Sequence, residues 1–209
     1  MGKEKEISHD GLKLPLVEEF FTIQGEGYHS GEAAWFIRLG GCDIGCNWCD
    51  SRFTWDPAMY PLVPTKKIVE HALGSGSKSV IVTGGEPLMW NLDLLCEGLK
   101  KTGLRTFIET SGAYRLSGLW DWICLSPKRN KPPIEDICLK ADELKVIIES
   151  RDDFAWAEKY RKLVGPRCRL YLQPEWRRFR TVIPEIVSFV KENPCWKISL
   201  QIHKYMHIP

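Results

Sequence analysis

Short apolar runs, rich in β-branched and aromatic residues, recur along the chain and are bounded by glycine, proline or polar residues. Runs of roughly four to eight such residues are typical of strands buried inside a fold. The predicted strands are Ala33–Leu39, 79–83, 105–109, Trp122–Leu125, Glu143–Ile148 and 169–172, with a last strand-like run at 196–202.

Helical segments separate most of these strands. We predict helices at 66–73, 92–102, 152–163 and 184–192. Thr65 and Asn91 stand where an N-cap residue accepts hydrogen bonds from the first turn, and Gly74 and Gly103 stand where a glycine ends a helix. Strands that alternate with helices form right-handed βαβ units and a parallel sheet.

About six βα units fit into the 209 residues of the chain. A complete eight-unit barrel takes about 250 residues. The predicted fold class is therefore α/β, an incomplete (β/α)6 TIM-like barrel. We expect one domain, 1–209, in which residues 1–13 form a polar, loosely ordered N-terminal extension.

The composition excludes several classes of function. The net charge of +2 indicates neither a nucleic acid nor an anionic membrane as partner. No apolar run approaches the roughly 20 residues that span a bilayer, and the polar N-terminus has no signal-peptide core. We therefore expect a cytoplasmic protein. In a reducing cytosol the eight cysteines are not expected to form disulfides, and the five scattered ones are interpreted as small buried hydrophobic residues.

Three cysteines carry the clearest chemistry. Cys42, Cys46 and Cys49 have the spacing C-x3-C-x2-C and follow the predicted strand Ala33–Leu39 and a pair of glycines. A structural zinc site takes four ligands, and no further His or Cys stands beside this loop. A cubane iron–sulfur cluster takes one protein ligand per iron. Three cysteines therefore leave one iron open for a small molecule.

Polar and glycine-containing motifs follow the ends of several other predicted strands, at 84–87, 109–112, 126–128 and 173–176. In parallel α/β barrels these ends form the rim that carries the active site. Two glycines flank Glu26 and mark a loop where the backbone comes close to another group. Arg38 lies within an apolar strand, so it must be paired or face a site.

The cysteine loop resembles that of the radical S-adenosylmethionine (SAM) enzymes, in which three cysteines hold a [4Fe–4S] cluster and SAM chelates the free iron. From about Glu18 to its end, the chain resembles the 7-carboxy-7-deazaguanine synthases within that superfamily. The matching stretches are 23–27, 36–39, 48–50, 83–87, 109–110, 126–128, 173–174 and 201–204. The stretch 24–27 is far more specific than the Gly-Gly-Glu-Pro motif, which many radical enzymes share.

This resemblance implies a carbon–nitrogen lyase of queuosine and other 7-deazapurine biosynthesis. Its substrate would be 6-carboxy-5,6,7,8-tetrahydropterin, from which a 5′-deoxyadenosyl radical removes hydrogen at C6. The ring would then contract to 7-carboxy-7-deazaguanine, with loss of ammonia and re-formation of SAM. The resemblance further implies a [4Fe–4S] cluster, SAM and Mg²⁺ as cofactors, an electron donor such as flavodoxin, and a homodimer.

The resemblance also implies roles for single residues. Cys42, Cys46 and Cys49 would hold the cluster. The SAM-binding residues would be Trp48, Cys49, Asp50, Gly85, Glu86, Ser126, Pro127, Lys128, Gln173, Pro174, Glu175 and Trp176. Among them, Glu86 would meet the ammonium group of SAM and Gly85 would allow close approach of its methionine part. The substrate would contact Ile23, Gln24, Gly25, Arg38, Thr83 and Pro209, with Arg38 on its carboxylate as a bidentate pair.

One position departs from the family. Ser51 stands where the family usually has a threonine that ligates magnesium. Serine keeps the hydroxyl oxygen but loses the rotamer restriction of a β-branched residue. Because Mg²⁺ takes its other ligands from water and substrate oxygens, we expect the site to be kept and to bind more weakly.

The end of the sequence is apolar. We expect the tail from Gln201 to fold over the barrel mouth and to bring the carboxylate of Pro209 to the amino and ring N–H groups of the pterin, since two adjacent donors fit two carboxylate oxygens. A tail that only packs against the last strand is the alternative.

Two other functions remain open from the sequence. An activase that installs a glycyl radical on a partner protein shares the cysteine loop and the Gly-Gly-Glu-Pro motif, and a large bound client would favour it. A non-catalytic zinc-binding module belongs to another class. A colourless protein after anaerobic purification would favour zinc, and a brown one an iron–sulfur cluster.

Overall fold

The computed structural model describes residues 10–209. Its centre is a nine-stranded sheet with the strand order β3-β1-β2-β4-β5-β6-β7-β8-β9. The strands are β1 (Lys13–Ile23), β2 (Ala33–Leu39), β3 (Leu62–Pro64), β4 (Ser79–Gly84), β5 (Arg105–Thr110), β6 (Trp122–Leu125), β7 (Glu143–Ile148), β8 (Arg169–Pro174) and β9 (Trp196–Ile198). The helices are α1 (Thr65–Gly74), α2 (Asp93–Lys101), α3 (Glu135–Lys140), α4 (Asp152–Arg161), α5 (Phe179–Glu192) and α6 (Ile202–Met206).

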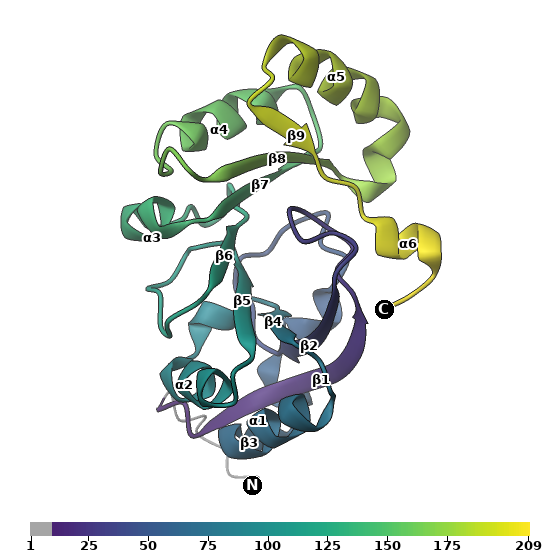
Figure 1. Cartoon of the computed structure of the whole chain (residues 1–209). Coiled ribbons are helices and arrows are strands. Elements are labelled where there is room, and N and C mark those ends of the chain that lie inside the picture. The colour runs from purple at the N-terminus through teal and green to yellow at the C-terminus, as the bar shows by residue number, and fades with distance from the viewer. Residues whose placement is uncertain (1–9) are drawn as a thin grey trace, which may run out of the picture.

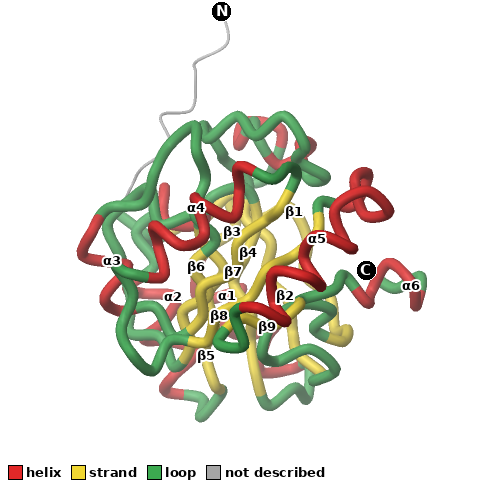
Figure 2. The backbone as a smooth tube through the Cα atoms, turned by 90° about the horizontal axis from the view of Figure 1, so that it is seen from above, coloured by secondary structure: helices red, strands yellow, loops and turns green. Residues whose placement is uncertain are grey.

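The sheet is an open barrel. Strand β2 and strands β4 to β9 run parallel to one another, whereas β1 pairs antiparallel with β2 and β3. Strands β3 and β9 end the sheet on opposite sides. The helices lie outside the curved sheet, as the two views at right angles show (Figures 1 and 2). The predicted fold class, an incomplete α/β barrel, is confirmed.

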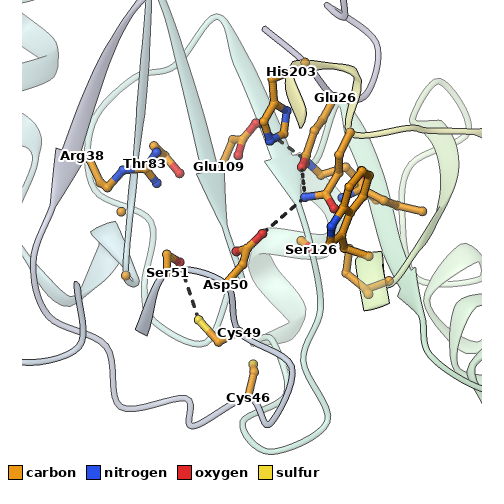
Figure 3. Close-up of a pocket in the computed structure, with 18 of the residues that line it drawn as sticks. Glu26, Arg38, Cys46, Cys49, Asp50, Ser51, Thr83, Glu109, Ser126 and His203 are labelled. Carbon is orange, nitrogen blue, oxygen red and sulfur yellow. Dashed lines mark hydrogen bonds and ion pairs between the residues drawn. The ribbon is translucent and has the colours of Figure 1, made fainter. Parts of the chain in front are cut away.

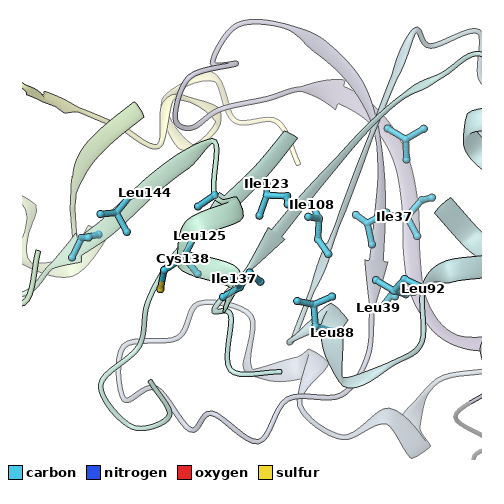
Figure 4. Close-up of a cluster of buried hydrophobic side chains, with 14 of the residues drawn as sticks. Ile37, Leu39, Leu88, Leu92, Ile108, Ile123, Leu125, Ile137, Cys138 and Leu144 are labelled. Atoms are coloured by element: carbon cyan, nitrogen blue, oxygen red, sulfur yellow. The ribbon is translucent and has the colours of Figure 1, made fainter. Parts of the chain in front are cut away.

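Alternation along the strands separates a helix-facing core from an interior face. On β2, Ile37 and Leu39 belong to the large apolar cluster under the helices, while Phe36 belongs to a small cluster with Ala34, Ile81 and Phe107. Figure 4 shows part of the large cluster. Because successive side chains on a strand point to opposite faces, Arg38 shares the interior face with Phe36. Both line the same cavity.

Several element boundaries differ from the prediction. Helix α5 begins at Phe179 and includes Pro184, which the sequence suggested as its start because proline favours a first helical turn. The last strand stops at Ile198, and the short helix α6, which was not predicted, follows at Ile202. Helix α3 was also not predicted.

Neither predicted N-cap residue stands at the N-cap position. In α2 that position is Leu92, without a side-chain cap, and Asn91 lies one residue earlier, where its side chain accepts a hydrogen bond from the Asp93 N–H. The prediction for Thr65 is wrong: it is the first residue of α1, and its hydroxyl donates to the carbonyl of Gly11. The backbone N–H of Thr65 also donates to Leu12 at 2.9 Å.

Of the expected N-terminal extension, residues 1–9 lie outside the described part of the chain. Residues 11 and 12 take part in the hydrogen bonds to α1, and Lys13 already belongs to β1. Among residues 10–209, no helix combines the length and apolar character that crossing a membrane requires.

Candidate active site

The carboxyl ends of the parallel strands surround a cavity of about 490 Å³. Strands β2, β4, β5, β7 and β8 each contribute a polar side chain to its wall: Arg38, Thr83, Glu109, Lys145 and Gln173. Figure 3 shows Cys46 and Cys49 on one side of this space, Glu26, Glu109 and His203 on the other, and Asp50 with Ser51 between them. The cavity therefore has a sulfur side and a charged polar side.

Nearly all residues that the sequence assigned to the site line this one cavity. Pro127 is the exception, because it lines a neighbouring cavity of about 410 Å³ on the far side of Cys46 and Trp48. The cavity also includes several residues for which no role was predicted, among them Glu26, Glu109, Lys145, Gln201, His203 and Lys204.

The cysteine loop is held by backbone hydrogen bonds. Gly41 N–H donates to Thr54 at 2.7 Å and Cys42 N–H donates to Trp55 at 3.1 Å. Gly41 itself has a φ of 104°, a left-handed conformation that glycine adopts without strain. The three thiols end up partly buried at the cavity wall.

These thiols fit a cluster better than a single metal ion. No group of three His, Cys, Asp or Glu side chains in the described chain, 10–209, is close enough to hold one ion. Zinc needs its ligands within about 2.3 Å of one point, whereas a cubane cluster offers each cysteine its own iron. Burial raises the pKa of Cys42 to about 11 and also raises that of Cys46, so the thiols become good ligands only when a metal displaces their protons.

The glycine pair after β4 packs on the cysteine loop. Gly85 N–H donates to Leu39 at 2.9 Å. A Cβ atom added to Gly85 would lie 2.3 Å from the Gly41 carbonyl oxygen and 2.7 Å from the Cys42 Cβ atom. The structure thus supplies a reason for this glycine that the sequence did not reveal, namely close contact with the protein's own loop.

The Glu86 carboxylate, which is expected to meet the ammonium group of SAM, already accepts hydrogen bonds from within the protein. It is 1% exposed, and its two oxygens accept four hydrogen bonds. One oxygen accepts from the Leu88 N–H and the Thr110 hydroxyl, and the other accepts from both the N–H and the hydroxyl of Ser111. A carboxylate has about four acceptor positions. Glu86 therefore ties the loop after β4 to the end of β5.

Arg38 is both paired and directed at the cavity. Its Nε donates to Glu18 at 2.7 Å, and its guanidinium lies 5.7 Å from the ring centre of Phe20. The two terminal nitrogens have no hydrogen-bond partner within residues 10–209. They are thus available to an anion in the cavity.

Three charged residues meet inside the barrel; we call Glu26, Glu109 and Lys145 the interior charge cluster. The Lys145 ammonium lies 2.5 Å from Glu26 and 3.6 Å from Glu109. Burial alone would raise the pKa of Glu26, but Lys145 outweighs it and lowers this pKa to about 2. One signal in the sequence could have revealed the lysine: it stands at an interior-facing position of an otherwise apolar strand, as Arg38 does.

The C-terminal segment lies over the cavity mouth. The Ile202 N–H donates to Gly25 at 2.9 Å, and Lys204 pairs with Asp50 at 2.7 Å. A Cβ atom at Gly25 would lie 2.2 Å from Nδ1 of His203, so the glycine makes room for this ring. Pro209 lines the cavity, and its carbonyl oxygen accepts a hydrogen bond from Thr22 at 3.3 Å.

Comparisons with known proteins agree with this geometry. A sequence profile of the radical SAM superfamily matches residues 36–123, which include the cysteine loop and the Gly-Gly-Glu-Pro motif. The chain is 50% identical over 210 residues to the 7-carboxy-7-deazaguanine synthase of Flavobacterium psychrophilum, with both chains covered completely. It is 45% identical to the same enzyme of a Synechocystis species, with 94% of each chain covered.

A solved structure shows the same fold. The crystal structure of QueE from Escherichia coli superposes with a TM-score of 0.78 at 27% sequence identity, covering 92% of this chain and 95% of the other. The fold and the site define a radical SAM enzyme, and this superfamily implies a [4Fe–4S] cluster and SAM as cofactors. Within it, the chain belongs to the family of 7-carboxy-7-deazaguanine synthases.

We predict that Glu86→Gln destabilises the fold by about 1–3 kcal/mol, because the new amide group would face N–H and O–H donors without an acceptor. Urea unfolding of the apoprotein measures this loss. Glu97→Gln is the matched control, since the Glu97 side chain is 59% exposed on α2 and pairs only with Lys101. An unchanged midpoint for Glu86→Gln would show that the four hydrogen bonds contribute no stability.

Proposed function

We propose that the cavity binds 6-carboxy-5,6,7,8-tetrahydropterin beside SAM and converts it to 7-carboxy-7-deazaguanine with loss of ammonia. One observation carries the proposal: a three-cysteine loop and an arginine with two unpaired terminal nitrogens face the same cavity. Family membership supports it, because relatives that match over nearly their whole length carry the name of this synthase. No comparable support exists for the activase or the zinc module.

Cys42, Cys46 and Cys49 would hold the [4Fe–4S] cluster. The bound cluster and SAM would supply the radical chemistry that begins the ring contraction. The protein's part is to orient both molecules and to exclude water from the closed cavity.

The SAM side of the cavity would use residues beside the cysteine loop. Lys128 lies 5.4 Å from the ring centre of Trp48, and its ammonium donates to the carbonyl and hydroxyl of Ser126. Burial lowers the pKa of Lys128. The wall along the nucleoside and carboxylate of SAM would be formed by Ser126, Lys128 and the end of β8 at Gln173 and Pro174. Glu175 and Trp176 would lie at the edge of this wall.

The substrate side would use the opposite wall. Arg38 would bind the carboxylate as a bidentate pair, and Gln24 and Thr83 would contact the pterin through hydrogen bonds. The contact of Pro209 with the amino and ring N–H groups stays a prediction. It is supported by the place of Pro209 at the cavity wall.

Magnesium would bind at Ser51. Its hydroxyl lines the cavity 3.6 Å from the Cys49 sulfur. The neighbouring Asp50 is paired with Lys204. Mg²⁺ keeps water and substrate oxygens as its other ligands, so a single protein oxygen between cluster loop and substrate suits it.

The proposal extends to partners. An electron donor such as flavodoxin would reduce the cluster. A second copy of the chain would pack on exposed apolar side chains beside the site, where Phe53 and Met59 are 54% and 73% exposed.

The main experiment is an anaerobic turnover assay with the carboxylated tetrahydropterin, SAM, Mg²⁺ and a reductant, followed by mass spectrometry. We expect the deazapurine product and one ammonia per turnover from the wild type. Cys46→Ala should lose the brown colour and the activity while its circular dichroism is kept, because the barrel has its own apolar core. Normal turnover of this variant, with iron retained, would contradict the cluster assignment.

Ser51→Ala should raise the magnesium concentration needed for half-maximal rate, because the variant loses the hydroxyl oxygen. Rates are titrated with Mg²⁺ in the wild type, in Ser51→Ala and in Ser51→Thr, which restores the family residue and should lower the requirement. Three superimposable curves would remove Ser51 from the metal site.

Arg38→Ala should weaken substrate binding by about 3 kcal/mol, roughly a hundredfold in Kd, and leave SAM binding nearly unchanged. Glu18→Gln is the matched control, since it removes the negative charge beside Nε and leaves both terminal nitrogens of Arg38 unchanged. Equal losses for substrate and SAM would assign Arg38 a structural role.

A further inference from the structure

The buried ammonium group of Lys145 forms ion pairs with two carboxylates inside the barrel, those of Glu26 and Glu109. Lys145 is 4% exposed and comes from the middle of β7, while Glu109 comes from β5 and Glu26 from the loop after β1. Within residues 10–209, no other cation forms an ion pair with either carboxylate. Lys145 thus joins three separate parts of the barrel wall.

Each carboxylate also fixes a neighbour in the cavity. Glu109 accepts from the side-chain amide of Gln24 at 2.9 Å, and Glu26 accepts from Gln201 at 2.8 Å. The Glu26 N–H in turn donates to Gln24 at 3.0 Å. The position of Gln24, a proposed substrate contact, and of the C-terminal segment therefore depends on where Lys145 holds the two carboxylates.

A third carboxyl group nearby, that of Glu143, forms no ion pair with this ammonium within residues 10–209. Glu143 accepts hydrogen bonds from the Tyr28 N–H and the Trp122 indole through one oxygen, and its other oxygen is buried without a partner. Burial raises the pKa of Glu143, which favours its neutral form. Lys145 is left to balance Glu26 and Glu109.

Glu109 keeps one oxygen for the cavity. Its Oε1 atom accepts the hydrogen bond from the Gln24 side-chain amide and forms the ion pair with Lys145. Its Oε2 atom has no hydrogen-bond partner within the described residues. The Glu109 side chain is 25% exposed and lines the cavity. An ionised carboxylate only accepts hydrogen bonds, while a protonated one would present a donor to the N–H groups of a pterin.

We propose that Lys145 is a positioning residue for the reaction: it holds Glu26 and Glu109 so that the free oxygen of Glu109 accepts a hydrogen bond from the pterin N–H groups. The inference rests on the proposed function, because it names the recognition device for the same substrate. Without the ammonium, two carboxylates in a water-poor interior would move apart or take up protons.

The test compares Lys145→Met with the wild type in substrate turnover and in binding of 6-carboxypterin, a fluorescent oxidised analogue with the same carboxylate and donor edge. We expect at least about 100-fold weaker analogue binding, as for truncation of one member of a buried charge pair. The absorbance of the iron–sulfur cluster and the affinity for SAM should be unchanged. Lys145→Arg keeps the charge and should restore most of the binding.

The pH profile separates positioning from packing. The titratable groups around Lys145 come from several elements. They are Glu26 after β1, Glu109 on β5, Cys124 on β6, Glu143 on β7, Lys128 after β6 and His203 on α6. In the wild type Lys145 holds the pKa of Glu26 at about 2, so binding persists as the pH falls. In Lys145→Met, Glu26 loses this ammonium and takes up a proton at higher pH, so the arrangement that holds Gln24 and the C-terminal segment, and analogue binding with it, should be lost on acidification well before wild-type binding.

Two controls keep the test decisive. Glu143→Gln changes a carboxyl group whose hydrogen bonds go to Tyr28 and Trp122 rather than to Lys145, and it should leave binding and its pH profile unchanged. If Lys145→Met does not fold, the double variant Glu26→Gln with Lys145→Met removes one charge of each sign, and it should fold yet still bind the analogue weakly. Wild-type affinity and pH profile in Lys145→Met or in the double variant would overturn the inference. A wild type that neither binds nor turns over pterin would overturn the proposed function instead.

Discussion

The close packing of two backbone segments fixes the rest of the site. The residues after β4 lie directly on the cysteine loop after β2: the Gly85 N–H donates to Leu39, and the Glu86 N–H donates to Gly41 at 2.8 Å. No side chain fits at Gly85. From this contact the Glu86 carboxylate reaches the end of β5, so three neighbouring strand ends are connected by hydrogen bonds. The cysteines are thereby held at the rim before any ligand binds.

The interior of the barrel follows a simple division. Nearer the start of strands β2, β4 and β5, the apolar side chains of Phe36, Ile81 and Phe107 pack together on the interior face. One pleat further along the same strands, the interior positions carry Arg38, Thr83 and Glu109. Because each strand alternates between its two faces, the change from apolar to polar on the interior leaves the helix-facing core intact. The barrel can thus hold charges inside without losing its apolar core.

The sequence predicted the strands well and the charges only in part. Ala33–Leu39, Trp122–Leu125 and Glu143–Ile148 are runs whose ends are marked by glycine or polar residues, and they match β2, β6 and β7. Short helices such as α3 and α6 carry too few turns to show a period. Arg38 was recognised because it interrupts an apolar run. The roles of Glu86 and Lys145 could not be derived, because their partners come from strands far away in the sequence.

The C-terminal segment also determines when the site is completed during synthesis. Lys204 pairs with Asp50, which is 154 positions away in the sequence, and Pro209 accepts a hydrogen bond from Thr22, which is 187 positions away. A chain grows from its N-terminus, and contacts between distant positions form late because they close long loops. The cysteine loop is therefore translated well before the segment that covers the cavity mouth. Until residues 201–209 are in place, the cavity and the cysteines in its wall lack the cover that this segment provides.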